Sequence, residues 1–249
     1  MKRIAQLIVT IIVFLGATII FNFLAALMIG NNASGLAFLG NFPGQTQATY
    51  LDRYIGFMAQ DTLGWFTYVT LGSTQDLQIL AGGVIFFNNI LMYNPPIPTY
   101  SGAIGLIPIL MDYGAHSPPL LDVAIPALAW LLMLVCPFVI TGIIAGAVAK
   151  TKKGAMGNMI LSILVIAVIG IVLNIIHVVM NFDLSVSWKF SATIIQNPIY
   201  AFLLTLYGNN LLSTNQISYI ISMSIVAFVF AVINGLVFSI ESVIVARKK

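Results

Sequence analysis

Apolar residues are gathered in long runs along this chain, and the stretches between the runs are rich in Gly, Pro, Asn and Thr. Four runs are long enough to cross a bilayer as helices, which takes about 20 apolar residues. They cover residues 5–29, 123–149, 157–180 and 218–246. The pattern predicts an all-α integral membrane protein, a four-span transmembrane helical bundle that forms a single polytopic domain over residues 1–249.

Basic residues stand beside these runs and predict the orientation of the chain. Lys2 and Arg3 precede the first run, an inner turn at 150–156 carries three lysines, and 247–249 is basic throughout. Lysine and arginine are retained on the cytoplasmic side. With four spans, all three clusters fall on that side. We therefore expect a multi-pass protein of the cell membrane with both termini cytoplasmic and the segments 31–122 and 181–216 outside.

The first run is expected to stay in the mature protein. The apolar core of a cleaved signal peptide has about 7–15 residues. The run that follows Arg3 continues to about Gly30, nearly twice that length. We therefore interpret it as a signal anchor that forms the first span.

Each outer segment contains a shorter apolar piece, at 77–93 and at 199–213. A piece of about 17 residues fits a re-entrant or interfacial segment as well as a span. If 77–93 alone crossed the membrane, the lysine turn and the C-terminal cluster would both move outside, against the positive-inside rule. We therefore expect both pieces to re-enter or lie flat on the outer side.

The two outer segments also share a motif, N-N-[IL]-L-x-x-N, at 88–94 and at 209–215. Its asparagines are Asn88, Asn89, Asn94, Asn209, Asn210 and Asn215. The motif predicts a parallel internal repeat, whose units are related by an axis along the membrane normal. Asparagine both donates and accepts hydrogen bonds, so these side chains either cap freed backbone groups or bind a solute.

Composition excludes several classes of protein. Hydrophobic residues make up 60% of the chain and charged residues 7%, with a mean hydropathy of +1.04, whereas soluble domains carry about 25% charged residues. The net charge of +3 arises from membrane-edge clusters and does not indicate nucleic-acid binding. Cys136 has no second cysteine to pair with. No Walker A, G-x-S-x-G or metal-ligand spacing occurs, so we expect no enzyme activity, metal or cofactor.

Polar side chains inside the predicted spans are the candidate functional residues, because a polar group in the membrane is costly. They are Asn22, Asn174, His177, Asn234 and Glu241. Local explanations exist for each of them. Glu241 can pair with Arg247 at the cytoplasmic edge, and Asn174 and His177 share a helical face that suits an interhelical hydrogen bond.

A G-x-x-x-G motif at Gly142 and Gly146 predicts a helix-packing face in the second span. Small residues let a second helix approach closely. We expect this face to pack against the third or the last span, and self-association is the alternative.

The sequence is consistent with two functions. The first is a non-catalytic subunit or scaffold of a larger membrane complex, whose partners are the lipid bilayer and other membrane proteins or a second copy. The second is a small-solute or ion permease or channel, with a path between two pseudo-symmetric halves. Convergence of the five intramembrane polar residues on one cavity favours transport, whereas separate local pairing favours a scaffold.

Overall fold

The computed structural model describes residues 3–30, 55, 58–59, 62–71, 120–181 and 216–246 of the chain. Its elements are the α-helices α1 (Arg3–Gly30), α4 (Thr62–Leu71), α7 (Leu120–Val148), α8 (Lys152–Asn181) and α11 (Gln216–Ala246). Four of them, α1, α7, α8 and α11, are long and apolar enough to cross a membrane. The predicted all-helical fold, with four helices long and apolar enough to span a membrane, is confirmed for this part of the chain.

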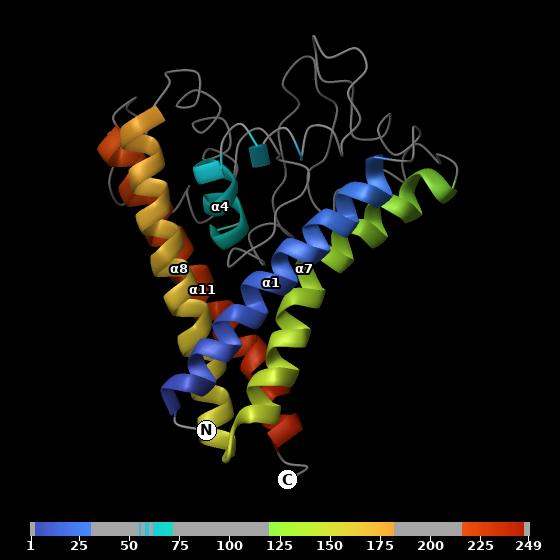
Figure 1. The fold of residues 1–249 in the computed structure, drawn as a ribbon, viewed down its shortest axis with the longest axis vertical. Coiled ribbons are helices and arrows are strands. Elements are labelled where there is room, and N and C mark those ends of the chain that lie inside the picture. Colours follow the sequence, from blue (N-terminus) through green and yellow to red (C-terminus); the bar gives the residue numbers. More distant parts are fainter. Residues whose placement is uncertain are drawn as a thin grey trace, which may run out of the picture.

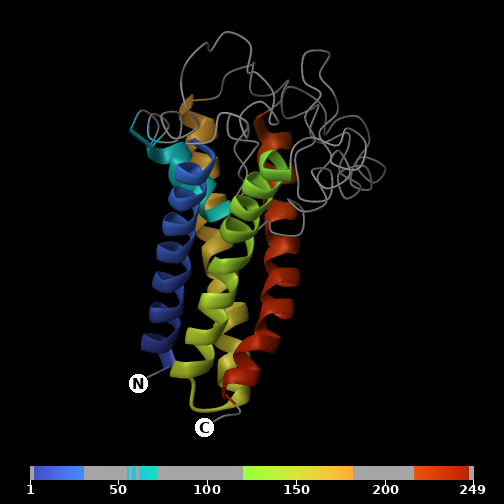
Figure 2. The same ribbon diagram turned by 90° about the vertical axis from the view of Figure 1, so that its right-hand side faces the viewer.

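The four long helices form two antiparallel pairs. The most extensive contacts join α1 to α7 and α8 to α11. The start of α1, the α7–α8 turn and the end of α11 lie together at one end of the bundle, which we call the turn end (Figures 1 and 2). The two pairs meet near the turn end and lean apart toward the opposite, far end (Figure 1).

Three phenylalanines from three helices fill the core where the pairs meet. The rings of Phe14 on α1 and Phe138 on α7 meet edge to face, with centroids 5.1 Å apart. Phe138 also stacks on Phe238 of α11 at 4.5 Å. Both arrangements suit the aromatic quadrupole and add to the free energy gained from burying the rings. The cluster therefore ties the α1–α7 pair to α11.

The turn between α7 and α8 is shorter than the sequence predicts. α8 begins at Lys152 instead of at 157, inside the basic cluster. The reason is Thr151, whose Oγ1 accepts a hydrogen bond from the backbone N–H of Gly154 at 3.0 Å. A threonine in this position satisfies one of the donors left free at a helix start. Lys152 and Lys153 thus belong to the first turn of α8, and both side chains are exposed.

α7 begins at Leu120, three residues before the predicted start, and it contains Pro126 and Pro137. Proline removes a backbone donor and bends a helix. α7 changes direction along its length (Figure 1). The hydroxyl of Thr141 donates to the carbonyl of Pro137 at 2.5 Å, a back-bond that is common in membrane helices. The helix therefore continues through both prolines.

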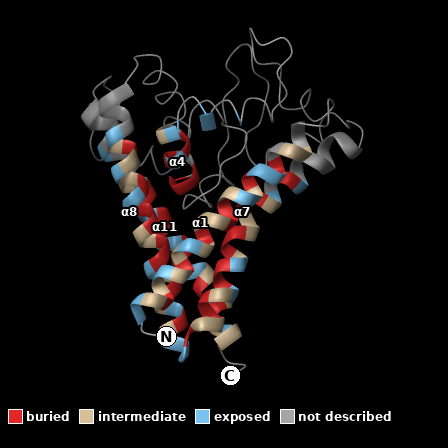
Figure 3. Cartoon of the chain, viewed as in Figure 1, coloured by how far each residue is buried: buried red, intermediate tan, exposed pale blue. Residues whose placement is uncertain are grey.

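The outer faces of the long helices are apolar, while buried residues line the faces that meet one another (Figure 3). Ile4 is 72% exposed and Ile240 is 62% exposed. Such a continuous exposed apolar surface is typical of helices that contact lipid.

α4 is a short helix that packs mainly on α8 and lies between the two pairs, toward the far end (Figure 1). Its last residues, Thr70 and Leu71, are buried against α8. The apolar pieces at 77–93 and 199–213 and the six asparagines of the outer motif lie outside the described residues.

Candidate functional site

Two glycines of α7 lie at a close contact with α11, a helix of the other pair. A Cβ atom on Gly142 would lie 3.4 Å from the backbone oxygen of Phe238, and one on Gly146 would lie 2.8 Å from Cβ of Val245. The Gly146 position also meets the backbone oxygen of Ser242. The G-x-x-x-G face thus packs on α11, the last span, and neither position has room for a side chain.

Glu241 lies at this same glycine contact. Its Oε2 is 2.9 Å from the place where a Cβ on Gly142 would stand, so the carboxylate covers the glycine. The residue is partly buried, one to two turns from the end of α11. A carboxylate near the end of a span reaches interfacial water easily, which lowers the cost of its charge.

The other predicted polar residues are spread over three helices. Asn22 of α1 is fully buried, and its Nδ2 donates to the carbonyl of Thr18 at 2.7 Å. Asn174 is 4% exposed on α8, and His177 lies in the same helix, although its side chain is outside the described part. Asn234 is fully buried on α11, and the neighbouring Gly235 lies against Ile160 of α8.

A buried amide pair that sequence reasoning missed joins α1 to α8. Nδ2 of Asn158 donates to Oε1 of Gln6 at 3.3 Å, and both side chains are buried. The sequence held a weak signal for it, because polar residues recur every four positions at the start of both helices. Both residues stand one position inside their predicted spans, which start at 5 and at 157, and the pattern offered no reason to pair them.

The buried hydroxyl groups are mostly engaged within their own helices. Those of Thr10, Thr18, Thr67, Thr141 and Ser162 each donate to the carbonyl four residues earlier. Each hydroxyl proton is therefore already used locally. These hydrogen bonds lower the cost of placing a polar residue in an apolar bundle.

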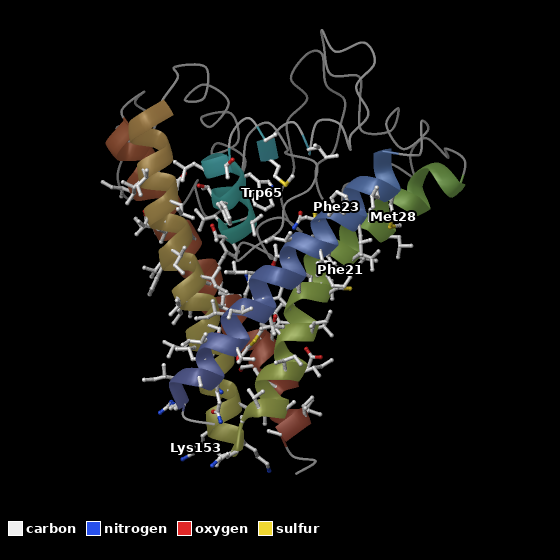
Figure 4. All side chains as sticks on the ribbon, viewed as in Figure 1. Phe21, Phe23, Met28, Trp65 and Lys153 are labelled. Carbon is white, nitrogen blue, oxygen red and sulfur yellow. The ribbon has the colours of Figure 1, made fainter. Side chains whose placement is uncertain are left out.

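Side chains on the long helices show the same division between apolar faces and a charged end. Phe21, Phe23 and Met28 lie on the far half of α1, and Lys153 lies at the turn end (Figure 4). Among the described residues, no three or more His, Cys, Asp or Glu side chains are grouped as a metal site. Glu241 therefore does not belong to such a group of ligands within the described part of the chain.

No known protein family, characterised protein or solved structure matches this chain. The positions of the polar residues within the helices are therefore the features of this chain that indicate a function.

Proposed function

We propose that this protein is a non-catalytic multi-pass membrane protein that acts as a subunit or scaffold of a larger membrane complex. One observation carries the proposal: the buried polar groups are distributed over separate helix contacts. Glu241 is at the α7–α11 contact, Gln6 meets Asn158 between α1 and α8, and Asn22 bonds within α1. Polar groups that each serve a local contact stabilise the assembly of a bundle.

The surfaces available to partners agree with this role. The outer faces of the long helices are apolar over their length and suit lipid or another membrane helix. We propose a location in the cell membrane with both termini cytoplasmic. This is supported by the position of the α7–α8 turn, with Lys150, Lys152 and Lys153, at the same end as the start of α1 and the end of α11 (Figure 2).

Purification from the native membrane in a mild detergent tests the proposal. Mass spectrometry identifies the proteins that accompany the chain, and native mass gives the size of the particle. We expect unrelated membrane proteins in fixed stoichiometry. A particle containing only this chain, whether monomer or homo-oligomer, would overturn the subunit role.

The second candidate is a small-solute or ion permease with a path between the halves. It is favoured by the burial of two amide side chains, Asn22 of α1 and Asn174 of α8, inside helices long and apolar enough to cross a membrane. Glu241→Gln tests it, because the amide keeps the shape of the side chain and removes its charge. For a permease, solute flux into reconstituted vesicles is expected to change at unaltered expression. Unchanged flux would exclude a role for the carboxylate.

We also propose the parallel internal repeat and the re-entrant or interfacial position of the apolar pieces at 77–93 and 199–213, and we add that the outer segment 31–122 enters the bilayer at α4. Each repeat unit corresponds to one helix pair, α1 with α7 or α8 with α11, and these are the pairs with the most extensive contacts. Re-entry is supported by α4, because Leu71 reaches Gly170, a residue inside the apolar span Lys152–Ile176. An outer segment that reaches this residue enters the bilayer.

A further inference from the structure

α1 and α8 carry the same series of buried positions at a constant separation. Gln6, Thr10, Thr18 and Asn22 of α1 are all buried. Adding 152 to each number gives Asn158, Ser162, Gly170 and Asn174 of α8, which are also buried. Amide matches amide at both ends and hydroxyl matches hydroxyl at the second position. Between the second and third positions of the series, Phe14 of α1 and its counterpart Ile166 of α8 are also buried.

The first two positions of the series also make the same local hydrogen bond. The hydroxyl of Thr10 donates to the carbonyl of Gln6 at 2.9 Å, and that of Ser162 donates to the carbonyl of Asn158 at 2.6 Å. Thr10 and Ser162 are both 0% exposed. The two helices therefore share side-chain type, burial and bonding over their first turns.

The amide contact between α1 and α8 joins equivalent residues of this series. Asn158 donates to Gln6, and these residues are 152 positions apart, the same separation that relates the two helices. In a two-fold symmetric contact, a residue near the axis meets its own counterpart. The Gln6–Asn158 pair is therefore where such an axis would pass.

A second contact, between α7 and α11, repeats this relation. With a separation of 97, Met133 and Leu134 correspond to Phe230 and Ala231, and all four are buried. The basic clusters at 150 and 247 then coincide. Gly142 corresponds to position 239 and contacts residues 238 and 241, on either side of it. In the same way, Gly146 corresponds to position 243 and contacts residues 242 and 245. Here too, each residue lies beside its own equivalent.

We infer that α1–α7 and α8–α11 are two copies of one helix-pair unit, joined by an isologous contact around a pseudo-two-fold axis through Gln6 and Asn158. These two amides fix the register of one unit on the other. The inference is independent of whether the protein is a subunit or a permease, and it rests on residues other than the outer asparagines. A buried amide that has one correct partner is known to specify register in helical assemblies.

Gly170 marks the point where the two units differ. Its counterpart is Thr18, whose side chain is buried and bonded to the carbonyl of Phe14. Only the glycine leaves room for α4, because a Cβ there would lie 2.6 Å from Cγ of Leu71 and 2.7 Å from Oγ1 of Thr70. The short helix α4 lies between α1 and α7 in the sequence, yet it packs on α8 of the second unit.

The inference is tested with two exchanges that use the same residue types. The first exchanges the amides across the axis, Gln6→Asn with Asn158→Gln. The second exchanges residues along one helix, Gln6→Thr with Thr10→Gln in α1, or Asn158→Ser with Ser162→Asn in α8. Thermal unfolding of the full-length protein in detergent gives Tm for each variant and for the four-residue combination of the two along-helix exchanges.

We expect the exchange across the axis to leave Tm nearly unchanged, since equivalent positions accept each other's residue. Each exchange along a helix should lower Tm by about 5 °C, because one buried amide loses its partner. The combination should cost less than the sum of its parts, because either exchange alone already breaks the one hydrogen bond between Gln6 and Asn158. An additive combination, or an exchange across the axis as harmful as those along a helix, would overturn the inference.

Discussion

At the residue scale, single glycines of this protein differ sharply in what surrounds them. Gly146 faces the backbone oxygen of Ser242 and the side chain of Val245, whereas Gly16 of α1 has no atom within 4 Å of its Cβ position. Both lie inside long helices, where alanine is intrinsically better than glycine by about 1 kcal/mol. Their local environments therefore predict opposite effects for the same substitution.

We expect Gly146→Ala to destabilise the protein by about 1–3 kcal/mol, because the new methyl group forces α7 away from the α11 backbone. Gly16→Ala should be neutral or stabilise the protein by up to about 1 kcal/mol. Chemical or thermal unfolding in detergent, followed by circular dichroism, measures both. Equal effects of the two variants would contradict the close approach of α7 and α11.

At the element scale, α4 depends on one position of α8 for its place in the bundle. Thr70 and Leu71 sit over Gly170, and Trp65, Thr67 and Val69 are buried as well. A helix of 10 residues is too short to be stable in water by itself. The packing on α8 is therefore what holds α4 in its conformation.

We expect Gly170→Val to release α4 while the four long helices stay assembled, because the branched side chain would overlap Leu71 and Thr70. Hydrogen–deuterium exchange should rise at least tenfold over residues 62–71 and change little in α7 and α11. Val168→Leu is the control, since residue 168 is exposed on the same helix. Unchanged exchange in α4 would show that other contacts hold it.

At the scale of the whole molecule, the arrangement of four antiparallel spans determines which parts of the chain share a side of the membrane. The turn end contains exposed Lys150, Lys152 and Lys153, and α1 begins there with Arg3 (Figure 4). No acidic residue stands in the first turn of α8 to balance these charges. By the positive-inside rule, we propose that this charged end lies in the cytoplasm.

We expect reporter fusions at both termini to be cytoplasmic and a fusion within 31–122 to be outside. Green fluorescent protein at either terminus should fluoresce, and alkaline phosphatase inserted near residue 100 should be active in a bacterial host. Lys150, Lys152 and Lys153 changed together to Gln should weaken this bias, while Thr151→Ser should not. Activity of alkaline phosphatase at either terminus would contradict the predicted topology.

The sequence by itself predicted the four described helices that are long and apolar enough to span a membrane, with their approximate bounds. Length and hydrophobicity are sufficient for that, because a helix in lipid must satisfy its own backbone hydrogen bonds. The sequence also identified Gly142 and Gly146 as a packing face, since few other residues permit close approach. It left open which helix they meet, and it placed the start of α8 five residues too late.

Only the tertiary structure decided how the polar residues are grouped. Asn22 and Glu241 looked like members of one set because both are polar residues within apolar runs, yet Asn22 bonds to Thr18 within α1 and Glu241 covers Gly142 at the α7–α11 contact. Gln6 and Asn158, near helix starts, looked unimportant and prove to be partners across 152 residues. A hydropathy pattern reports whether a position is apolar along its own helix. It carries no information about which helix that face meets, because pairing depends on the shape and direction of side chains from distant parts of the chain.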